Sequence, residues 1–595
     1  MAKRKDAGVK TVTPSPAPAP AKRPPPPVQP VKKPSPLRVF VLVLRIALCG
    51  VALYVLWHRI HPKQDTLQLA GEEDVARYEP IEREEVRRDA VLDAFKHSYL
   101  AYERDAFGFD DYHPISHRGD NMSPAGPVGY FLIDSLDSLL IAGMDEEYKR
   151  ARDWVAELSF DLDDKFHVFE VHLLLNLLME AVLTARQVEQ ITIRVLGGLL
   201  SAYQLDGEKD QMLLVKAVDL ADRILPAFDT PSGLPMSFVN LAKRKGIPDA
   251  DNRGMASVAE AGTLQLEFKY LSEVTGSPVY WQKVEKVMDV IRDQPKKDGL
   301  VPLFMRPDTG TFVFSDIRLG SRADSYYEYL GKQYLQTNRT EPQYKLMHDE
   351  AMGGIKKHLL KKSVTKGLVY TSELQPGRSR SGGFELQDVP KQDHLVCFLG
   401  ASLLLGVTEG AGPLPPDEST FTDSQIDDWY AGKALIKTCV DTYTSSKTGL
   451  APEIVNYYLD PSLAHSAGRD WFINSRHLSA THPPIDARNI LRPETVESLF
   501  VAYRLTGDPV YREWGWTIFQ TFVEHCRLPD GGFASILDVD EVPVKYEDRM
   551  ETFWISETLK YLFLLFSEKD VVPLDQWVFN TEAHPFKRFT PTVEH

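Results

Sequence analysis

Residues 499–511, Leu-Phe-Val-Ala-Tyr-Arg-Leu-Thr-Gly-Asp-Pro-Val-Tyr, contain the pattern that decides the fold. An amphipathic, helix-like run with aromatic residues is followed by a tight glycine turn and the start of a second run. Residues 199–207 and 266–281 share this form. A glycine just past a helix end adopts the left-handed conformation that terminates the helix. A short loop then makes the two helices antiparallel neighbours. The sequence therefore predicts a chain of α-hairpins.

The helical pattern continues nearly throughout from about Glu82 to the C-terminus. Repeated α-hairpins over some 500 residues indicate an all-α domain, either a solenoid or a closed α/α toroid. Their spacing is too irregular for a regular repeat array. A closed toroid places helix ends around a central cavity, so catalytic or binding residues are expected there.

The composition excludes several classes of protein. The 595 residues are 43% apolar and 26% charged, which is ordinary for a globular protein. Four cysteines rule out a disulfide-dense scaffold. The net charge of −16 argues against a nucleic-acid partner. At roughly 100–200 residues per domain, the length allows three to five domains or one large toroid with appendages.

The N-terminal 38 residues differ from the rest of the chain. They carry nine Lys or Arg and one acid, so this end is +8 and the remaining 557 residues are −24. Residues 11–36 include eleven prolines, which favour an extended and unpacked conformation. We interpret residues 1–38 as a basic, proline-rich cytoplasmic tail. It acts as a spacer or, in the alternative, binds a proline-recognising module.

Residues 39–57 form an apolar run whose only charged residue is Arg45. A helix of that length rises about 28 Å, close to a bilayer core of about 30 Å. The alternative is a signal peptide, but the run is long, begins far from the N-terminus and lacks a small-residue cleavage site. The basic cluster before it predicts a cytoplasmic N-terminus. We therefore expect a single-pass type II anchor at 39–57, a lumenal stem at 58–84 and a lumenal domain at 85–595.

Two asparagine triplets agree with a lumenal domain. Asn121-Met122-Ser123 and Asn338-Arg339-Thr340 both match the acceptor motif for N-glycosylation. Each match is weak alone because such triplets arise often by chance. The sequence does not decide whether either asparagine is used.

Carboxylates are frequent inside apolar or aromatic runs, where they are costly without a partner. These acids are Glu170, Glu260, Glu267, Asp324, Glu328, Glu453, Glu494, Glu497, Glu551, Glu557 and Glu582. Any one of them could be a helix cap or part of a solvated face, and Glu494 after Arg-Pro is an ordinary first-turn acid. Together around one cavity they suit hard-cation binding or glycoside cleavage by a carboxylic acid and a carboxylate. Zinc-type Cys/His spacing, a P-loop and a Gly-x-Ser-x-Gly motif are absent from the sequence.

Several of these runs resemble class I α-1,2-mannosidases, glycoside hydrolase family 47, over about Arg87 to Pro585. The shared motifs are Asp-Ser-Leu-Asp-Ser-Leu at 134–139, Arg-Ala-Asp-Ser-Tyr-Tyr-Glu-Tyr at 322–329, His-Leu-Val-Cys-Phe at 394–398, Arg-Pro-Glu-Thr-Val-Glu-Ser-Leu at 492–499 and Phe-Asn-Thr-Glu-Ala-His-Pro at 579–585. The resemblance implies an (α/α)7 barrel that removes terminal α-1,2-linked mannose from high-mannose N-glycans with inversion.

The resemblance also implies roles for individual residues. Glu170 matches the general acid, Asp324 and Glu494 match the other catalytic carboxylates with Glu494 favoured as the base, and Glu453 matches a further active-site acid. Thr581 matches the Ca²⁺ ligand, which binds through its hydroxyl and carbonyl oxygens. The residues expected to bind substrate are Arg194, Glu260, Arg322, Arg492, Glu497, Glu557 and Glu582. Cys397 and Cys439 match the family's disulfide, which leaves Cys526 free and Cys49 in the anchor.

Arg322 bears on specificity. By resemblance, Golgi-type relatives tend to carry a small or apolar residue here and the endoplasmic reticulum (ER) type carries Arg. The resemblance thus implies the ER form, which converts Man9GlcNAc2 to Man8GlcNAc2 in glycoprotein quality control. The alternative is that Arg322 only pairs with a nearby acid. We expect residence in the ER membrane, with the Golgi as the alternative, and N-glycans on glycoproteins as partners.

Two other functions compete with this one. A mannosidase-like lectin of ER-associated degradation would bind glycans with weak or no catalysis, and it could retain the same acids. A structural membrane tether built on the proline-rich tail would leave the acid motifs unexplained.

The sequence departs from the family at the predicted general acid. Relatives read Phe-Glu-x-Thr-Ile-Arg, whereas here residues 171–190 separate Glu170 from Ile191-Thr192-Ile193-Arg194. If the 24-residue separation were helical, it would span about 36 Å, too far for Glu170 and Arg194 to line one site. We interpret residues 171–190 as a retained intron, since Val codons can begin with GT and Gln codons can end with AG. The alternative is a genuine insertion that loops out or disables the enzyme.

We expect the mature transcript to lack the codons for residues 171–190. Sequencing the transcript across codons 170 to 191 measures this directly. If those codons are present, the insertion is genuine, and the lectin or an inactive protein becomes the stronger interpretation until cleavage is demonstrated.

Overall fold

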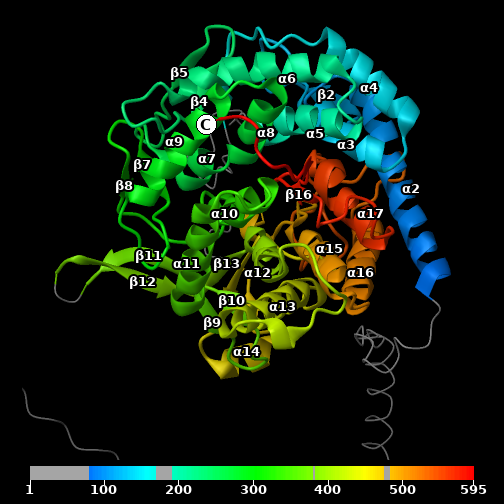
Figure 1. Cartoon of the computed structure of the whole chain (residues 1–595). Coiled ribbons are helices and arrows are strands. Elements are labelled where there is room, and N and C mark those ends of the chain that lie inside the picture. The colour runs from blue at the N-terminus through cyan, green and yellow to red at the C-terminus, as the bar shows by residue number, and fades with distance from the viewer. Residues whose placement is uncertain (1–79, 169–190, 380–381, 475–482, 595) are drawn as a thin grey trace, which may run out of the picture. The chain divides into compact units, whose positions relative to one another are not determined.

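The computed structural model describes residues 80–168, 191–379, 382–474 and 483–594 (Figure 1). The predicted tail and anchor, most of the predicted stem, Glu170 and residues 171–190 lie outside these ranges. Helix α2 (Pro80–Ala106) begins within the predicted stem. None of the helices in these ranges has the length and apolar character that a bilayer span needs.

Inner and outer helices alternate along the chain, and together they form a ring that the chain follows once (Figure 1). The inner helices are α3 (Tyr130–Ile141), α5 (Gly197–Leu205), α8 (Gln265–Thr275), α10 (Asp324–Gln336), α12 (Phe398–Thr408), α15 (Glu494–Thr506) and α17 (Lys560–Phe566). Two π-helical turns, η2 (Ile191–Leu196) and η7 (Trp554–Leu559), lead into α5 and α17. Each inner helix contacts the next, and η7 contacts α3, so the inner ring is closed.

Each inner helix packs against an outer one. The outer helices are α2, α4 (Asp145–Glu157), α6 (Gln211–Ile224), α9 (Val279–Asp293), α11 (Pro342–His358), α13 (Asp423–Thr444) and α16 (Val510–His525). Seven such pairs occur within the described residues. The prediction of a helix-rich domain is therefore confirmed, and the closed inner ring excludes the solenoid alternative.

The three predicted α-hairpins form where the glycines were quoted. Gly276 and Gly507 end α8 and α15 in the left-handed conformation, with φ of 69° and 71°. Gly207, with φ of 72°, follows α5 in the same way. A residue with a Cβ is strained at this φ, so glycine sets the point at which each inner helix turns back to its outer partner.

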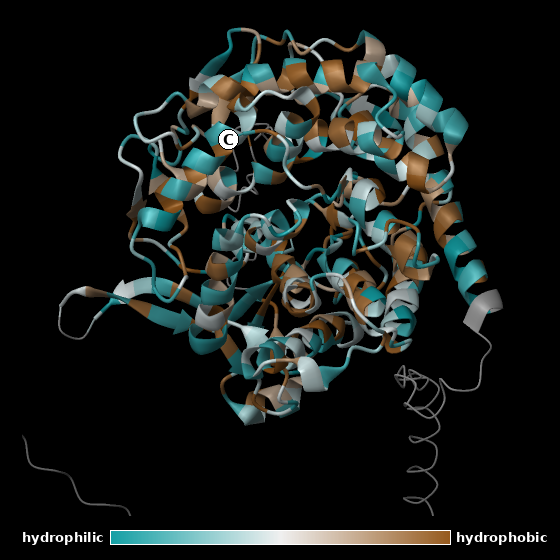
Figure 2. Cartoon of the chain, in the orientation of Figure 1, coloured by the Kyte–Doolittle hydropathy of each residue, from teal (hydrophilic) through white to brown (hydrophobic). Residues whose placement is uncertain are grey.

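Burial separates the two layers. Tyr130 to Leu139 of α3 are all buried, whereas only Ala151 and Val155 are buried in α4. Figure 2 shows α4 mainly in the hydrophilic colour. An amphipathic outer helix faces solvent on one side. An inner helix is enclosed by two inner neighbours and one outer helix. Its polar residues must therefore find partners inside the protein.

Short antiparallel strands connect the helices, so the all-α description was too strict. They are β1 (Asp111–His113) with β2 (Arg118–Asp120), β3 (Lys165–His167) with β4 (Phe238–Asn240) and β5 (Lys245–Ile247), β6 (Ala256–Ser257) with β7 (Phe304–Arg306) and β8 (Thr311–Val313), β9 (Leu360–Lys362) with β10 (Val369–Thr371), β11 (Glu373–Arg378) with β12 (Phe384–Val389), β13 (Lys391–Asp393) with β14 (Ile454–Tyr457) and β15 (Trp471–Phe472), and β16 (Trp577–Phe579) with β17 (Pro585–Lys587). Most have only two or three residues, too few for an alternating pattern to be visible in the sequence.

Two of these hairpins are distinctive. The β11–β12 hairpin projects from the ring (Figure 1). In the β16–β17 hairpin, Phe579 pairs with Pro585, so residues 580–584 form the connecting loop. This loop carries Thr581, the predicted calcium ligand.

The predicted disulfide is confirmed. Cys397, at the end of η4 (His394–Cys397), is bonded to Cys439 in α13, and their Cα atoms are 6.0 Å apart. The bond joins an inner segment to its outer helix. Cys526 is free and buried, as predicted.

Replacing both Cys397 and Cys439 with Ala should lower the free energy of unfolding by about 3 to 4 kcal/mol, because the bond closes a loop of 42 residues that restricts the unfolded chain. Denaturant unfolding with and without reductant measures this. Reductant should destabilise the wild type and leave the double variant unchanged. Cys526→Ala is the matched control, and it should keep the response to reductant.

Candidate active site

A pocket of about 510 Å³, part of it open to solvent, lies among the ends of the inner helices. Its lining comes from η2, α10, η4, α12, α15, η7 and the 580–584 loop. The lining residues are Arg194, Asp324, Ser325, Glu328, Leu395, Phe398, Arg492, Pro493, Glu494, Glu497, Phe553, Glu557, Thr581 and Glu582. Eight residues predicted from the sequence are therefore brought together from segments as far apart as positions 194 and 582.

Two of the predicted catalytic acids occupy equivalent places. Asp324 is the first residue of α10 and Glu494 is the first residue of α15. The N-terminus of a helix carries a partial positive charge that stabilises an anion. Both helices belong to the inner ring, so each presents an acid to the pocket at the end where its dipole favours the ionised form.

The surroundings of Glu494 hold it ionised. His394 Nδ1 donates to the Glu494 carboxylate at 2.8 Å, and Arg492 Nη1 lies 3.5 Å from it. Burial acts to raise the pKa of Glu494, but Arg492 and His394 outweigh burial and bring this pKa below its ordinary value. A buried carboxylate that stays ionised can accept a proton, which is the property a general base needs.

His394 is itself oriented from behind. Its Nε2 lies 3.1 Å from both the Tyr443 hydroxyl and Thr495 Oγ1. Because a carboxylate only accepts, Nδ1 carries the proton toward Glu494, and in the neutral ring Nε2 accepts from a hydroxyl. The three groups fix the tautomer and direction of the imidazole. His394 was quoted in a family motif but not predicted as a site residue.

Glu453 lies behind the pocket lining. Its carboxylate binds Arg492 Nε at 2.8 Å, and Arg492 in turn faces Glu494. Glu453 is therefore connected to the pocket through Arg492 and does not belong to its wall.

The pKa values of two other acids of the pocket are raised. Burial raises the pKa of Glu497 to about 8, although Lys332, 3.5 Å away, opposes the change, and Glu328 and Glu494 add to it. Burial and the neighbouring Glu582 raise the pKa of Glu557 well above its ordinary value. The pocket therefore holds more buried carboxyl groups than its cations can keep ionised.

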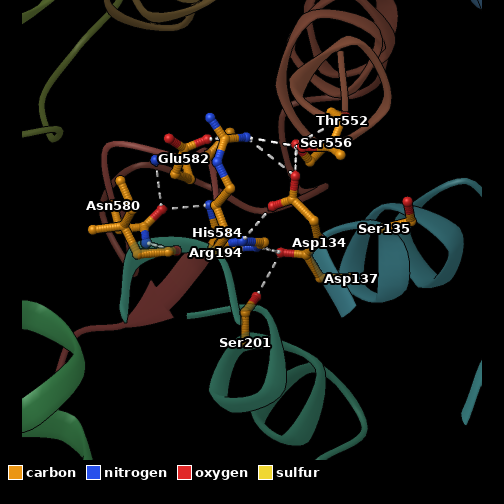
Figure 3. A network of polar contacts seen from close by, with 12 residues as sticks. Asp134, Ser135, Asp137, Arg194, Ser201, Thr552, Ser556, Asn580, Glu582 and His584 are labelled. Carbon is orange, nitrogen blue, oxygen red and sulfur yellow. Dashed lines mark hydrogen bonds and ion pairs between the residues drawn. The ribbon is translucent and has the colours of Figure 1, made fainter. Parts of the chain in front are cut away.

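Arg194 is held at one wall of the pocket (Figure 3). Its Nη1 contacts Asp134 at 3.2 Å, Thr552 Oγ1 at 3.0 Å and Glu582 at 2.8 Å. Phe553 lies against the guanidinium at 5.5 Å. One cation thus joins η2, α3, the segment before η7 and the 580–584 loop, and its planar group has a fixed orientation toward the pocket.

Asn580 organises the loop that carries Thr581 (Figure 3). Its Nδ2 donates to Ile193 O at 2.9 Å and to Glu267 at 2.8 Å. Its Oδ1 accepts from the backbone N–H groups of Glu582 and His584 at 2.9 and 2.8 Å. The Asn580 side chain therefore connects the backbone of the loop to η2 and α8 by hydrogen bonds. These buried polar contacts determine the direction of the loop.

Beneath Arg194 lies a second layer of buried charges (Figure 3). His584 bridges Asp137 at 2.7 Å and Asp134 at 3.2 Å. Lys560 Nζ lies 2.9 Å from Asp137. Burial alone would lower the pKa of His584, but Asp137 and Asp134 raise it above its ordinary value. Burial alone would raise the pKa of Asp134, yet Arg194 and His584 lower it to about 2.

The donors in the pocket fit a hard cation held mainly through water. They are carboxylate, hydroxyl and carbonyl oxygens, which suit Ca²⁺. Among the described residues, no group of three His, Cys, Asp or Glu side chains is close enough to hold a metal directly. Thr581 lines the pocket beside the crowded carboxyl groups, where a divalent cation would offset their mutual repulsion.

Arg322 and Glu260 do not line this pocket. Glu260 accepts from Ser237 at 2.8 Å, and His167 Nε2 lies 3.2 Å from it. Arg322 has a left-handed backbone, with φ of 79°, and lies against Phe304 at 5.3 Å. Burial lowers the pKa of Arg322 and the charge of Glu260 opposes this change, so the two side chains interact electrostatically. They form a cluster separate from the pocket, and Arg322 lies two residues before Asp324 along the chain.

Glu170, the predicted general acid, and residues 171–190 lie outside the described residues. The residues that flank this range, Val168 and Ile191, are both buried in the same hydrophobic core.

Several contributing residues were not predicted as site residues, among them Asp134, Lys332, Phe553 and Asn580. Phe553 lines the pocket, and the other three contact residues of its walls. Asp134 and Asn580 belong to quoted motifs, whereas Lys332 does not. Nothing in the linear sequence indicates which buried charge pairs with which.

Comparisons with known proteins find related sequences and a related structure. Residues 94–588 match glycosyl hydrolase family 47. Mannosyl-oligosaccharide 1,2-alpha-mannosidase from Candida albicans is 44% identical over 84% of this chain and 83% of its own length. The endoplasmic reticulum mannosyl-oligosaccharide 1,2-alpha-mannosidase of Schizosaccharomyces pombe is 40% identical over 86% of this chain and 90% of its own length. The solved structure of an alpha-1,2-mannosidase from Trichoderma reesei is similar with a TM-score of 0.69, at 29% identity, over 84% of this chain and 99% of that one.

Asp134→Asn should lower the free energy of unfolding by about 3 to 5 kcal/mol at neutral pH, because it leaves Arg194 and His584 with less compensation in a buried site. The pKa of Asp134 is about 2 in the folded protein against about 3.9 unfolded. Its contribution is therefore present above about pH 4 and is lost as pH falls toward 2.

Denaturant unfolding of both proteins at several pH values measures this difference. The gap between wild type and variant should narrow on acidification. Asp153→Asn on the exposed face of α4 is the matched control, with an effect under about 0.5 kcal/mol. A gap that stayed constant down to pH 3 would contradict the role assigned to the Asp134 charge.

Proposed function

The chain belongs to glycosyl hydrolase family 47 and is a glycosidase, and we propose that it hydrolyses terminal α-1,2-linked mannose from high-mannose N-glycans with inversion. The observation that carries this proposal is the state of Glu494. It is held ionised by Arg492 and His394 in a pocket that it shares with Asp324. Inverting hydrolysis needs an ionised carboxylate of this kind to act as the base on a water molecule.

In this mechanism Glu494 is the general base. A water molecule attacks the anomeric carbon of the terminal mannose, and Glu494 accepts the proton that the water loses. The C–O bond to the next sugar breaks on the opposite face, and the departing oxygen receives a proton from the acid side. We assign that proton to Glu170, acting through a water, and we assign Asp324 to the stabilisation of positive charge on the sugar ring.

The walls of the pocket suit a sugar. Phe553, Phe398 and Leu395 offer apolar surface to a ring face, while Arg194 and Arg492 offer fixed donors for hydroxyl oxygens. Glu328, Glu497, Glu557 and Glu582 offer acceptors for hydroxyl protons. Alternating apolar and charged groups of this kind orient a polar ligand and exclude water from its faces.

We propose that Thr581 holds Ca²⁺ through its hydroxyl and carbonyl oxygens, with the pocket carboxylates acting through waters. When bound, this ion would orient sugar hydroxyls and offset part of the carboxylate charge. Asn580 supports this role because it fixes the backbone on which Thr581 sits.

We propose an ER setting and a single cleavage of Man9GlcNAc2 to Man8GlcNAc2. Arg322 supports this specificity, since the resemblance associates an Arg at this position with the ER form. Several similar proteins are named as ER enzymes. The whole architecture we infer is an (α/α)7 barrel behind a type II anchor at residues 39–57. A lectin without catalysis would not need an ionised base, so we do not propose a lectin function.

Cleavage of Man9GlcNAc2 by the purified full chain, compared with the same chain lacking residues 171–190, tests the activity. We expect the shortened chain to release one mannose and to lose activity when Ca²⁺ is chelated. Glu494→Gln should lower kcat by about 10²- to 10⁴-fold, the usual worth of general base catalysis, while glycan binding is retained. Asp153→Asn is the control. Binding without cleavage by the shortened wild-type chain would refute the proposal.

The fall of kcat/KM at acid pH should depend on the groups that surround Glu494. Activity falls as pH drops through the pKa of Glu494, which lies below its ordinary value of 4.5. His394→Leu removes one donor to the ionised form, so this limb of kcat/KM should move to higher pH. His394→Asn keeps an N–H donor and should restore part of the shift. An unmoved limb in both variants would contradict the positioning role of His394.

A further inference from the structure

The two asparagine triplets that match the N-glycosylation motif stand in different environments in the folded domain. Asn338, Arg339 and Thr340 are all exposed, in the turn that follows α10. Asn121 is only partly exposed, and Ser123 of the same triplet is 3% exposed. We propose that Asn338 carries an N-linked oligosaccharide and that Asn121 does not. The proposal rests on the lumenal placement of the domain in the proposed function.

The turn after α10 projects the Asn338 triplet outward. Asn338 and Arg339 both have left-handed backbones, with φ of 50° and 68°. Their N–H groups donate back to Leu335 O and Tyr334 O at 3.1 and 2.8 Å, which reverses the chain at the end of the helix. Asn tolerates this conformation better than most residues. The triplet is held on the surface by these backbone bonds and by local side-chain contacts, since Thr340 Oγ1 donates to Thr337 O at 2.9 Å and Arg339 Nε lies 2.6 Å from Glu409.

The Asn338 amide is compatible with an attached sugar. Its Nδ2 donates to Thr590 Oγ1 at 3.1 Å, an exposed contact. A side-chain amide has two N–H groups, and a sugar replaces one of them. The remaining N–H can still donate, so the fold does not depend on whether the sugar is present.

The Asn121 triplet is tied into the protein interior. Asn121 Oδ1 is buried and has no hydrogen-bond partner within the described part of the chain. Ser123 Oγ donates to Asp164 at 2.8 Å, and Met122 packs partly against the core. A bulky hydrophilic group on Asn121 would have to displace these contacts, and Pro124 further restricts the backbone at Ser123.

The modification needs a co-reactant, a lipid-diphosphate-linked oligosaccharide, and a transferase of the lumenal membrane face. Asn338 Nδ2 attacks the anomeric carbon of the first sugar, and a C–N bond forms. The C–O bond to the diphosphate breaks, and the lipid diphosphate leaves with the electron pair. The amide proton passes to a base of the transferase. This chain contributes only the accessible amide and the Thr340 hydroxyl.

The position of Asn338 keeps the oligosaccharide away from catalysis. Asp324 begins α10 in the pocket, and Asn338 follows the opposite end of that helix, about 21 Å along its axis. There the backbone N–H of Phe589 donates to Gln336 O at 2.8 Å, so the C-terminal residues dock beside the turn. The oligosaccharide would cover this junction and leave the pocket open.

Expression of the full chain in a eukaryotic cell, followed by enzymatic release of N-glycans in ¹⁸O-labelled water and peptide mass spectrometry, tests the proposal. We expect the label at position 338 and none at position 121. Asn338→Gln and Thr340→Val should each abolish the shift in mobility on glycan release, whereas Asn121→Gln should leave it unchanged. The activity of Asn338→Gln should stay within about twofold of wild type.

A reporter variant separates this proposal from the lumenal placement. Asp417→Asn creates a third Asn-x-Ser triplet at an exposed residue that caps a short 3-10 helix, and Asn can take over that cap. If the reporter is glycosylated and Asn338 is not, or if Asn121 is labelled, the proposal is overturned and the lumenal placement stands. If neither Asn338 nor the reporter is glycosylated, both are overturned.

Discussion

The pairing of Arg194 with Asp134 and Glu582 is the interaction on which the catalytic end of the ring depends. All three side chains are nearly inaccessible, and a buried charge without a partner is destabilising by several kcal/mol. Because Arg194 also binds Thr552, a single guanidinium sets the relative positions of η2, α3, the entry to η7 and the 580–584 loop. His584 and Lys560 extend the same constraint to Asp137. The polar interior of the ring is thus one connected network, and a change at one member alters the compensation of the others.

The proposed catalysis depends on glutamates that have different pKa values in the same pocket. Glu494 and Glu497 are one helical turn apart on α15, yet the pKa of Glu494 is lowered and that of Glu497 is raised to about 8. The cause is the partners: Arg492 and His394 face Glu494 at the helix N-terminus, while Glu497 shares the single ammonium of Lys332 with Glu328. A pocket can therefore hold both proton acceptors and neutral hydrogen-bonding acids at one pH without a change of residue type.

The helices and their turns could be predicted because their causes are local. Gly207, Gly276 and Gly507 terminate inner helices through their own backbone freedom, and Cys397 and Cys439 were recognisable by resemblance. The short hairpins could not be predicted, since strands of two or three residues have no periodicity and form only when distant segments meet. The sequence left open that Arg322 pairs with a nearby acid, but it could not identify Glu260 as that acid, because the two residues are far apart along the chain. Neither residue lines the pocket.

The sequence by itself determined the helix-rich class, the family and most of the residues that line the pocket, because helix periodicity, glycine turns and motif order are written in consecutive residues. Only the tertiary structure decided how the pKa values of the acids differ, that Glu453 binds Arg492, that His394 contacts Glu494, and which asparagine triplet is accessible. These properties depend on burial and on partners that are distant in the sequence, such as His394, which lies 100 residues before Glu494. Since the free energy of a buried charge is set by its neighbours in space, residue identity alone could not supply them.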